Sequence, residues 1–165
     1  MIASPRRIYF LRHGLADRSA FNGQDDRLRP LTDQGIARME SSALTLADLG
    51  LGCDAILSSP LTRCRQTAEI VAEALGLSDK LKIEAELAPG FDLADLPLLL
   101  TGNHGYTNVM LVGHEPDFSI TVSRLTGGSN ITFKKGGLAR VDLYQGLPEP
   151  KGTLVWLLPP KVLVL

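Results

Sequence analysis

Short β-forming runs alternate with amphipathic segments along this 165-residue chain. Apolar runs bounded by glycine, proline or polar turn residues predict buried strands, and alternation of apolar and polar residues predicts a half-buried strand. Residues 108–112 are almost wholly apolar, whereas residues 138–144 alternate. The predicted strands are residues 7–11, 54–57, 82–84, 108–112, 138–144 and 153–158.

Apolar residues recur at helical spacing in several segments between these strands. The predicted helices are residues 33–49, 60–75, 93–100 and 116–125. We expect Thr32 to cap the first helix and Gly50 to end it. We expect Ser59 to cap the second helix, with Pro60 at its first helical position and Gly76 at its end.

The order of these elements predicts the class of fold. Strands that alternate with helices favour an α/β protein, here a three-layer α/β/α sandwich with a mostly parallel central sheet. The length fits a single domain over residues 1–165. Residues 16–30 are polar and without periodicity, which predicts a long loop that is either functional or disordered.

Composition and charge narrow the classes of function. Hydrophobic residues make up 44% of the chain and charged residues 21%, which is typical of a soluble globular protein. With 17 Lys and Arg against 18 Asp and Glu, no basic excess points to nucleic acid. The apolar run at 8–11 is too short for a signal peptide or a membrane span, so we expect a cytoplasmic protein that binds no membrane. Cys53 and Cys64 match no zinc pattern, and Cys64 is expected to be a small buried hydrophobe.

The first chemical signal follows the first strand, where Arg12, His13 and Gly14 are consecutive. Ligands of α/β sheets bind beyond the carboxyl ends of strands, and Gly14 allows a sharp turn there. A neutral imidazole can act as a nucleophile, and a guanidinium can hold phosphate oxygens. Alternatively, Arg12 is a surface residue and His13 a hydrogen-bonded histidine at a strand end.

A second signal, Ser58 to Ala68, also follows a strand and opens a helix. The first turn of a helix favours anions, and Arg63 adds a full positive charge there. Because a cation opposes the helix dipole, Arg63 costs stability unless an anion or a carboxylate lies nearby. Arg65 and Glu69 are better explained as an exposed pair four residues apart.

A third signal, Val112 to Pro116, repeats the arrangement of strand, glycine, histidine and turn. Two parallel strands that end in this way can bring His13 and His114 to one rim of the sheet. His114 then either stabilises a phosphoryl group or simply caps a helix. His104, in a polar turn, is expected to be a solvated loop residue.

These three motifs, in this order, resemble those of the histidine phosphatase superfamily, which has the phosphoglycerate mutase-like fold. The resemblance covers residues 7–125 and is greatest to the short SixA-type phosphohistidine phosphatases. Residues 27–32, followed by Gly35, are also similar to that branch.

The resemblance implies a role for each motif residue. His13 would attack phosphorus and become phosphorylated, while Arg12, Arg63 and His114 would hold the phosphoryl oxygens. Water would then release phosphate, and neither a metal nor a cofactor is expected.

The general acid stays open, with Glu86, Asp92 or no residue as the alternatives. So does the part played by Arg29 and the loop around it. The substrate is expected to be a phosphorylated one, either protein phosphohistidine or a small phosphomonoester, and a non-catalytic phosphate-binding module is the alternative of another class. The oligomeric state is open, and the apolar tail 162–165 either completes the core or packs on another subunit.

Overall fold

Six strands form one mixed sheet, in the order β3-β2-β4-β1-β5-β6. The computed structural model describes residues 6–103 and 105–164. The strands are β1 (Arg7–Arg12), β2 (Ala55–Ser58), β3 (Leu81–Ile83), β4 (Asn108–Gly113), β5 (Leu138–Gln145) and β6 (Lys151–Leu158). The α-helices are α1 (Asp33–Asp48), α2 (Thr62–Ala74), α3 (Leu96–Gly102) and α4 (Asp117–Leu125). All six predicted strands and all four predicted helices are confirmed, with shifts of a few residues at their ends.

The predicted α/β class with a mostly parallel sheet is also confirmed. β1 and β2 each pair in parallel with β4, and β2 pairs in parallel with β3. β5 is antiparallel to β1, and β6 is antiparallel to β5. Only the short segment 146–150 joins β5 to β6, and parallel neighbours would need a much longer crossover.

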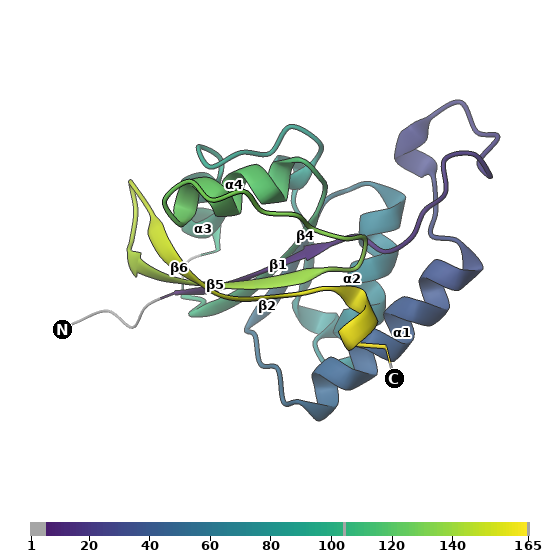
Figure 1. Cartoon of the computed structure of the whole chain (residues 1–165), viewed down its shortest axis with the longest axis horizontal. Coiled ribbons are helices and arrows are strands. Elements are labelled where there is room, and N and C mark those ends of the chain that lie inside the picture. The colour runs from purple at the N-terminus through teal and green to yellow at the C-terminus, as the bar shows by residue number, and fades with distance from the viewer. Residues whose placement is uncertain (1–5, 104, 165) are drawn as a thin grey trace.

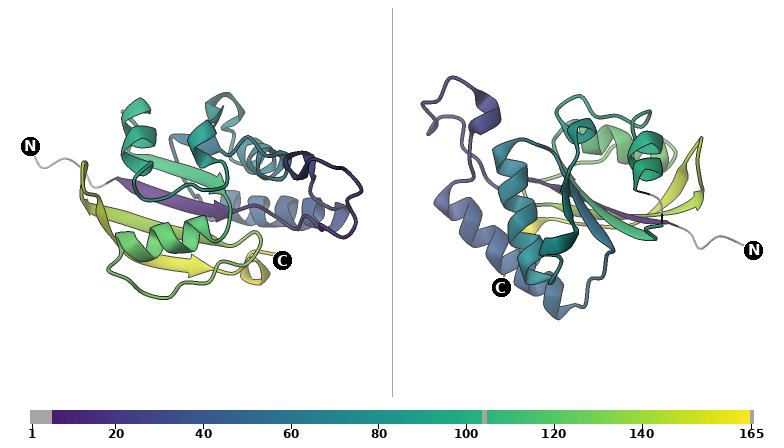
Figure 2. Two further views of the ribbon diagram at one scale, coloured as in Figure 1. Left: turned by 90° about the horizontal axis from the view of Figure 1, so that it is seen from above. Right: turned by 180° about the vertical axis from the view of Figure 1, so that it is seen from behind.

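Helices cover both faces of the sheet and form the three predicted layers (Figures 1 and 2). α3 and α4 lie on one face, where Phe118 and Leu96 pack with Ile8 and Phe10 of β1. α1 and α2 cover the other face, and their apolar stripes pack against the alternate residues of β1. β1 is therefore buried on both sides. Residues 16–30 project beyond its carboxyl end (Figure 1).

The predicted ends of the helices are confirmed at three of four positions. Thr32 caps α1, since its Oγ1 accepts a hydrogen bond from Gly35 N at 3.0 Å. Gly50 and Gly76, which follow α1 and α2, both have φ of 69°, the left-handed conformation that ends helices. The prediction for Ser59 and Pro60 is wrong, as the next paragraph describes.

Helix α2 begins three residues later than Ser59. Its N-cap is Leu61, which makes no side-chain capping hydrogen bond, so Pro60 lies before the helix rather than inside it. Residues 59–61 form the connection between the end of β2 and the first residue of α2. The hydroxyl of Ser59 is hydrogen-bonded to His114 and also accepts a longer hydrogen bond, of 3.3 Å, from Leu61 N in the turn before the helix.

The tail contributes to the core, as one of its two predicted roles required. Leu163 is 2% exposed and packs in the cluster beneath α1. The predictions for His104 and for Leu165 lie outside the described residues. No helix within the described ranges combines the length and the apolar character needed to cross a membrane.

Candidate active site

Strand register brings the two histidines to one rim of the sheet. Arg12 pairs with Gly113 in the parallel ladder of β1 and β4, and a histidine follows each of them. The rings of His13 and His114 consequently lie 5.6 Å apart, measured between their centroids. Helix α2 starts after the neighbouring strand β2, and its first turn places Arg63 at the same rim.

The four predicted residues line one pocket of about 540 Å³. The pocket is lined by Arg12, His13, Ala16, Asp17, Arg18, Asp26, Arg29, Arg63, Pro89, His114, Glu115 and Lys135. The structure therefore brings all four predicted residues together. It adds cations and carboxylates that periodicity and motif spacing did not single out.

The two motif glycines are required by close packing as well as by chain direction. A Cβ on Gly14 would lie 2.7 Å from Met39 Cγ, and one on Gly113 would lie 2.6 Å from Phe118 Cζ. Both distances are far below van der Waals contact. Glycine at each position lets a helix pack closely against the strand end beside the neighbouring histidine of the site.

His13 is held in the tautomer that a nucleophile needs. Its Nδ1 lies 2.7 Å from the carbonyl oxygen of Gly14. Because a carbonyl oxygen only accepts, Nδ1 donates, and Nε2 of the neutral ring keeps its lone pair. The pKa of His13 is lowered to about 3, chiefly by burial and also by the neighbouring His114 and arginines, although this hydrogen bond raises it in part. The ring is thus neutral near pH 7.

His114 is buried, and the side chains of Ser59 and Cys64 contact its ring. Ser59 Oγ lies 2.7 Å from its Nε2, and Cys64 Sγ lies 3.5 Å from the same atom. Burial and, to a lesser extent, the charge of Arg63 lower the pKa of His114 to about 4. The sequence predicted Ser59 only as a helix cap, not as a residue that contacts the site. Cys64 is fully buried, as predicted.

The two motif arginines keep unused donors inside the protein. Arg12 donates from Nη1 to Phe133 O at 2.8 Å, and Arg63 donates from Nη1 to Asp26 O at 2.9 Å. The Nε atoms of both arginines are buried without a hydrogen-bond partner in the described chain. Buried donors of this kind are normally satisfied, and an oxyanion in the pocket could supply the acceptors.

Asp26 supplies the carboxylate that the position of Arg63 at a helix start requires. Its Oδ2 lies 3.4 Å from Arg63 Nη2, and its Oδ1 accepts a hydrogen bond from Arg29 Nε at 2.8 Å. Arg29 is 6% exposed and also donates to the carbonyl oxygen of Ala16. The loop around Arg29 therefore forms part of the pocket wall. The exposed pair of Arg65 and Glu69 is confirmed, at 3.8 Å.

Neither carboxylate considered from the sequence as a general acid lines the pocket. Glu86 is exposed, and Asp92 Oδ1 accepts a hydrogen bond from Ala94 N. Both residues belong to the segment that follows β3, which reaches the pocket only with Pro89.

The carboxylates that do line the pocket are Asp17, Asp26 and Glu115. Hydrogen bonds from Ser19 lower the pKa of Asp17, and the hydrogen bond from Arg29 lowers that of Asp26. Both side chains are therefore ionised near pH 7. Glu115 is occupied through Oε1, which accepts a hydrogen bond from Ser119 N at 2.9 Å.

Two strand-end histidines among arginines, at the carboxyl edge of an α/β/α sheet, fit the class of histidine phosphatases. The comparisons agree: the chain belongs to the histidine phosphatase superfamily (branch 1), whose family model matches residues 8–89. It is 35% identical to an uncharacterized protein of Picosynechococcus sp., over 92% of this chain and 99% of that protein.

The sequence is also similar to the phosphohistidine phosphatase SixA of Escherichia coli strain K12. The identity is 28%, over 93% of this chain and 94% of the relative. A solved structure of the protein histidine phosphatase SixA in complex with tungstate superimposes with a TM-score of 0.81 at 28% identity, over 95% of this chain and 99% of that one. The resemblance to the SixA type and the phosphoglycerate mutase-like fold are thereby confirmed.

Proposed function

We propose that this protein hydrolyses protein phosphohistidine by way of a phosphohistidine intermediate on His13. The observation that carries the proposal is the hydrogen bond from His13 Nδ1 to Gly14 O, because it leaves Nε2 free and directed by a rigid strand end. The E. coli relative is a phosphohistidine phosphatase, which supports the same activity for this chain.

The proposed reaction has two steps. In the first, His13 Nε2 attacks phosphorus, a new P–N bond forms, and the P–N bond to the substrate imidazole breaks. Arg12, Arg63 and His114 hold the equatorial oxygens, where charge accumulates during phosphoryl transfer. In the second step, water attacks phosphorus and frees the His13 ring and inorganic phosphate.

The acids of the pocket favour a substrate whose leaving group needs no general acid from the protein. Asp17 and Asp26 have lowered pKa values and hold no proton near pH 7. An imidazole leaving group can instead be protonated from solvent before the P–N bond breaks. An alkoxide leaving group is far more basic and needs a nearby acid.

A small-molecule phosphomonoesterase is the second candidate. The observation in its favour is Glu115, a carboxylate that lines the pocket directly beside His114. If Glu115 delivers a proton to an ester oxygen, Glu115→Gln should reduce hydrolysis of an alkyl phosphate much more than hydrolysis of a phosphohistidine protein.

The decisive experiment is to trap the intermediate. Brief incubation with radiolabelled phosphoramidate, followed by alkaline denaturation, should yield a base-stable, acid-labile phosphoryl group on His13. His13→Ala should lose both the label and turnover. A label that persists in His13→Ala would overturn the assignment, and the absence of any label would favour a binding module.

Substrate class is tested by turnover of a panel. Hydrolysis of a phosphohistidine-bearing protein should exceed that of simple alkyl phosphates in kcat/KM, and excess chelator should leave the rate unchanged. Comparable rates on both kinds of substrate would overturn the specificity while leaving the His13 chemistry intact.

A further inference from the structure

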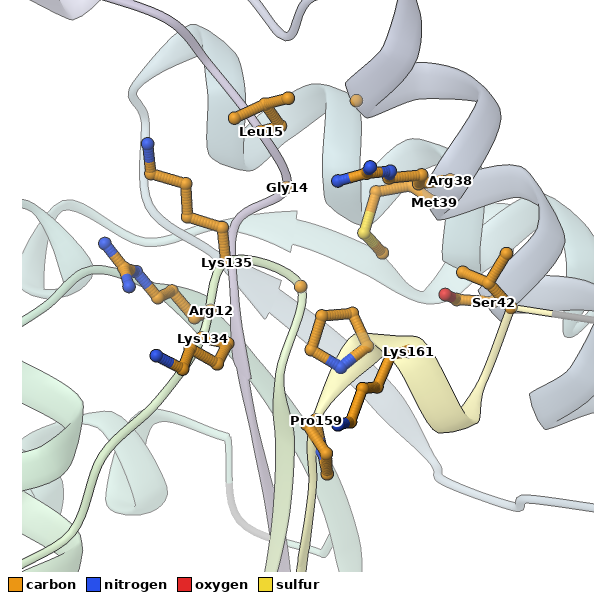
Figure 3. Close-up of a pocket in the computed structure, with 14 residues that line it drawn as sticks. Arg12, Gly14, Leu15, Arg38, Met39, Ser42, Lys134, Lys135, Pro159 and Lys161 are labelled. Carbon is orange, nitrogen blue, oxygen red and sulfur yellow. The ribbon is translucent and has the colours of Figure 1, made fainter.

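A second cavity, of about 780 Å³, adjoins the His13 pocket and shares Arg12 and Lys135 with it. We call it the basic cavity. It lies between α1, the loop before β5 and the C-terminal segment (Figure 3). Apart from Arg12 and Gly14, its lining residues belong to none of the three motifs and have no part in the proposed phosphoryl transfer.

The charge of the basic cavity is of one sign. Its lining includes Arg12, Arg38, Lys134, Lys135 and Lys161, and no carboxylate among the described residues. The same chain carries a net charge of -1, so this concentration of cations is local. The His13 pocket differs, because three carboxylates stand among its cations.

The three cations that line the basic cavity but not the His13 pocket are exposed and uncompensated. Arg38, Lys134 and Lys161 make no ion pair within the part of the chain that the structure describes. Arg38 extends from α1 toward the strand segment that carries Gly14 (Figure 3). Like-charged groups held together repel one another, so a negative partner would be stabilised here.

The apolar part of the lining indicates what kind of negative partner fits. Leu15, Met39, Pro159 and Pro160 line the cavity between the cations. An inorganic anion gains nothing from such a surface, and exposed lysines with long mobile stems form no fixed anion cradle. A protein surface that carries carboxylates beside apolar side chains matches both parts of the lining.

We propose that the basic cavity docks an acidic surface of the phosphoprotein substrate while the substrate's phosphohistidine enters the His13 pocket. The proposal rests on the proposed function. Carboxylates near the phosphohistidine pair with Arg38, Lys134 and Lys161, and the two adjoining cavities are filled by one continuous partner surface.

The test compares two synthetic peptides of equal length, each with one phosphohistidine. One carries four glutamates beside an apolar residue, and the other has glutamines in their place. The variant is Arg38→Gln/Lys134→Gln/Lys161→Gln. The control, Lys80→Gln/Arg124→Gln/Lys151→Gln, makes the same change of net charge at exposed residues outside both cavities.

The wild type should prefer the glutamate peptide by about tenfold in kcat/KM, because each of three exposed charge pairs changes affinity by roughly twofold. The variant should lose this preference through KM, and the control should keep it. Phosphoramidate hydrolysis should be equal in all three proteins. Added salt should weaken the preference in the wild type and in the control, because both keep the cavity cations.

The two possible failures look different. If neither peptide is hydrolysed while an alkyl phosphate is, the proposed function fails and the docking proposal fails with it. If both peptides are hydrolysed equally well by the wild type, or if the variant keeps the preference, only the docking proposal is overturned. Tripolyphosphate is tested as an inhibitor of all three proteins. If it inhibits the wild type but not the variant, while both show the same peptide preference, the docking proposal is overturned in favour of a small-anion site.

Discussion

Replacing Asp26 by Asn removes the negative charge that two buried arginines share. The side chains of Arg29 and Arg63 are only 8% and 7% exposed, whereas that of Asp26 is 45% exposed. Removing one partner of a fully buried ion pair costs about 3–5 kcal/mol, and an exposed pair contributes about 0–1 kcal/mol. Discounted for the exposure of Asp26, the expected loss is about 2 kcal/mol in the free energy of unfolding.

For a chain of this length, such a loss lowers the melting temperature by about 4–8 °C, measured by calorimetry without ligand. Asp25→Asn is the matched control, because Arg27 is the one ion-pair partner of Asp25 among the described residues, and its side chain is 77% exposed. That control should melt at the temperature of the wild type.

The same substitution should change the response to vanadate, an oxyanion that resembles the transferring phosphoryl group. Asp26 lines the pocket and repels an anion there, so Asp26→Asn should bind vanadate more tightly. Saturating vanadate should then narrow the gap in melting temperature between the variant and the wild type. An unchanged melting temperature, or a gap that widens with vanadate, would refute the role given to Asp26.

Three further predictions concern the histidines, a glycine and a serine of the site. Burial lowers the pKa of His13 to about 3 and that of His114 to about 4, so the unfolded chain binds more protons than the folded chain below pH 6.5. The free energy of unfolding should therefore fall as pH falls from 6.5 toward 4, and it should fall less steeply in His13→Gln. Gly113→Ala should cost about 1–3 kcal/mol in chemical denaturation through its clash with an aromatic ring, whereas Gly52→Ala, with open space around it, should not. Ser59→Ala should lower kcat about tenfold with little change in KM, because His114 loses its 2.7 Å hydrogen bond; wild-type kinetics would contradict this positioning role.

Sequence reasoning succeeded where one residue decides the local structure. Thr32, Gly50 and Gly76 mark helix ends through their own hydrogen bonds or their tolerance of positive φ, without help from distant residues. The position of His13 beside His114 could also be predicted from the sequence, because parallel strands that end in similar motifs meet at one edge of the sheet.

Sequence reasoning failed where a side chain chooses among distant partners. Ser59 is a typical capping residue, but besides a 3.3 Å hydrogen bond from Leu61 N its hydroxyl makes a 2.7 Å hydrogen bond with a histidine 55 positions away. Asp26 lies in an aperiodic loop, and only the folded chain brings it to Arg63, 37 positions away. The sequence did indicate that Arg63, a cation at a helix start, needs an anion or a carboxylate nearby. No local pattern identified Asp26 as that carboxylate.

The burial of β1 on both faces has a consequence for how the site opens. β1 pairs over its whole length with β4 and over five residues with β5, and its four central residues are at most 3% exposed. Its amides should exchange hydrogen only on global unfolding, whereas those of residues 16–30, outside the sheet, should exchange through local opening. The position of His13 would then be kept by the sheet even while residues 16–30 open locally, so that motion in this loop leaves the histidine at the rim in place.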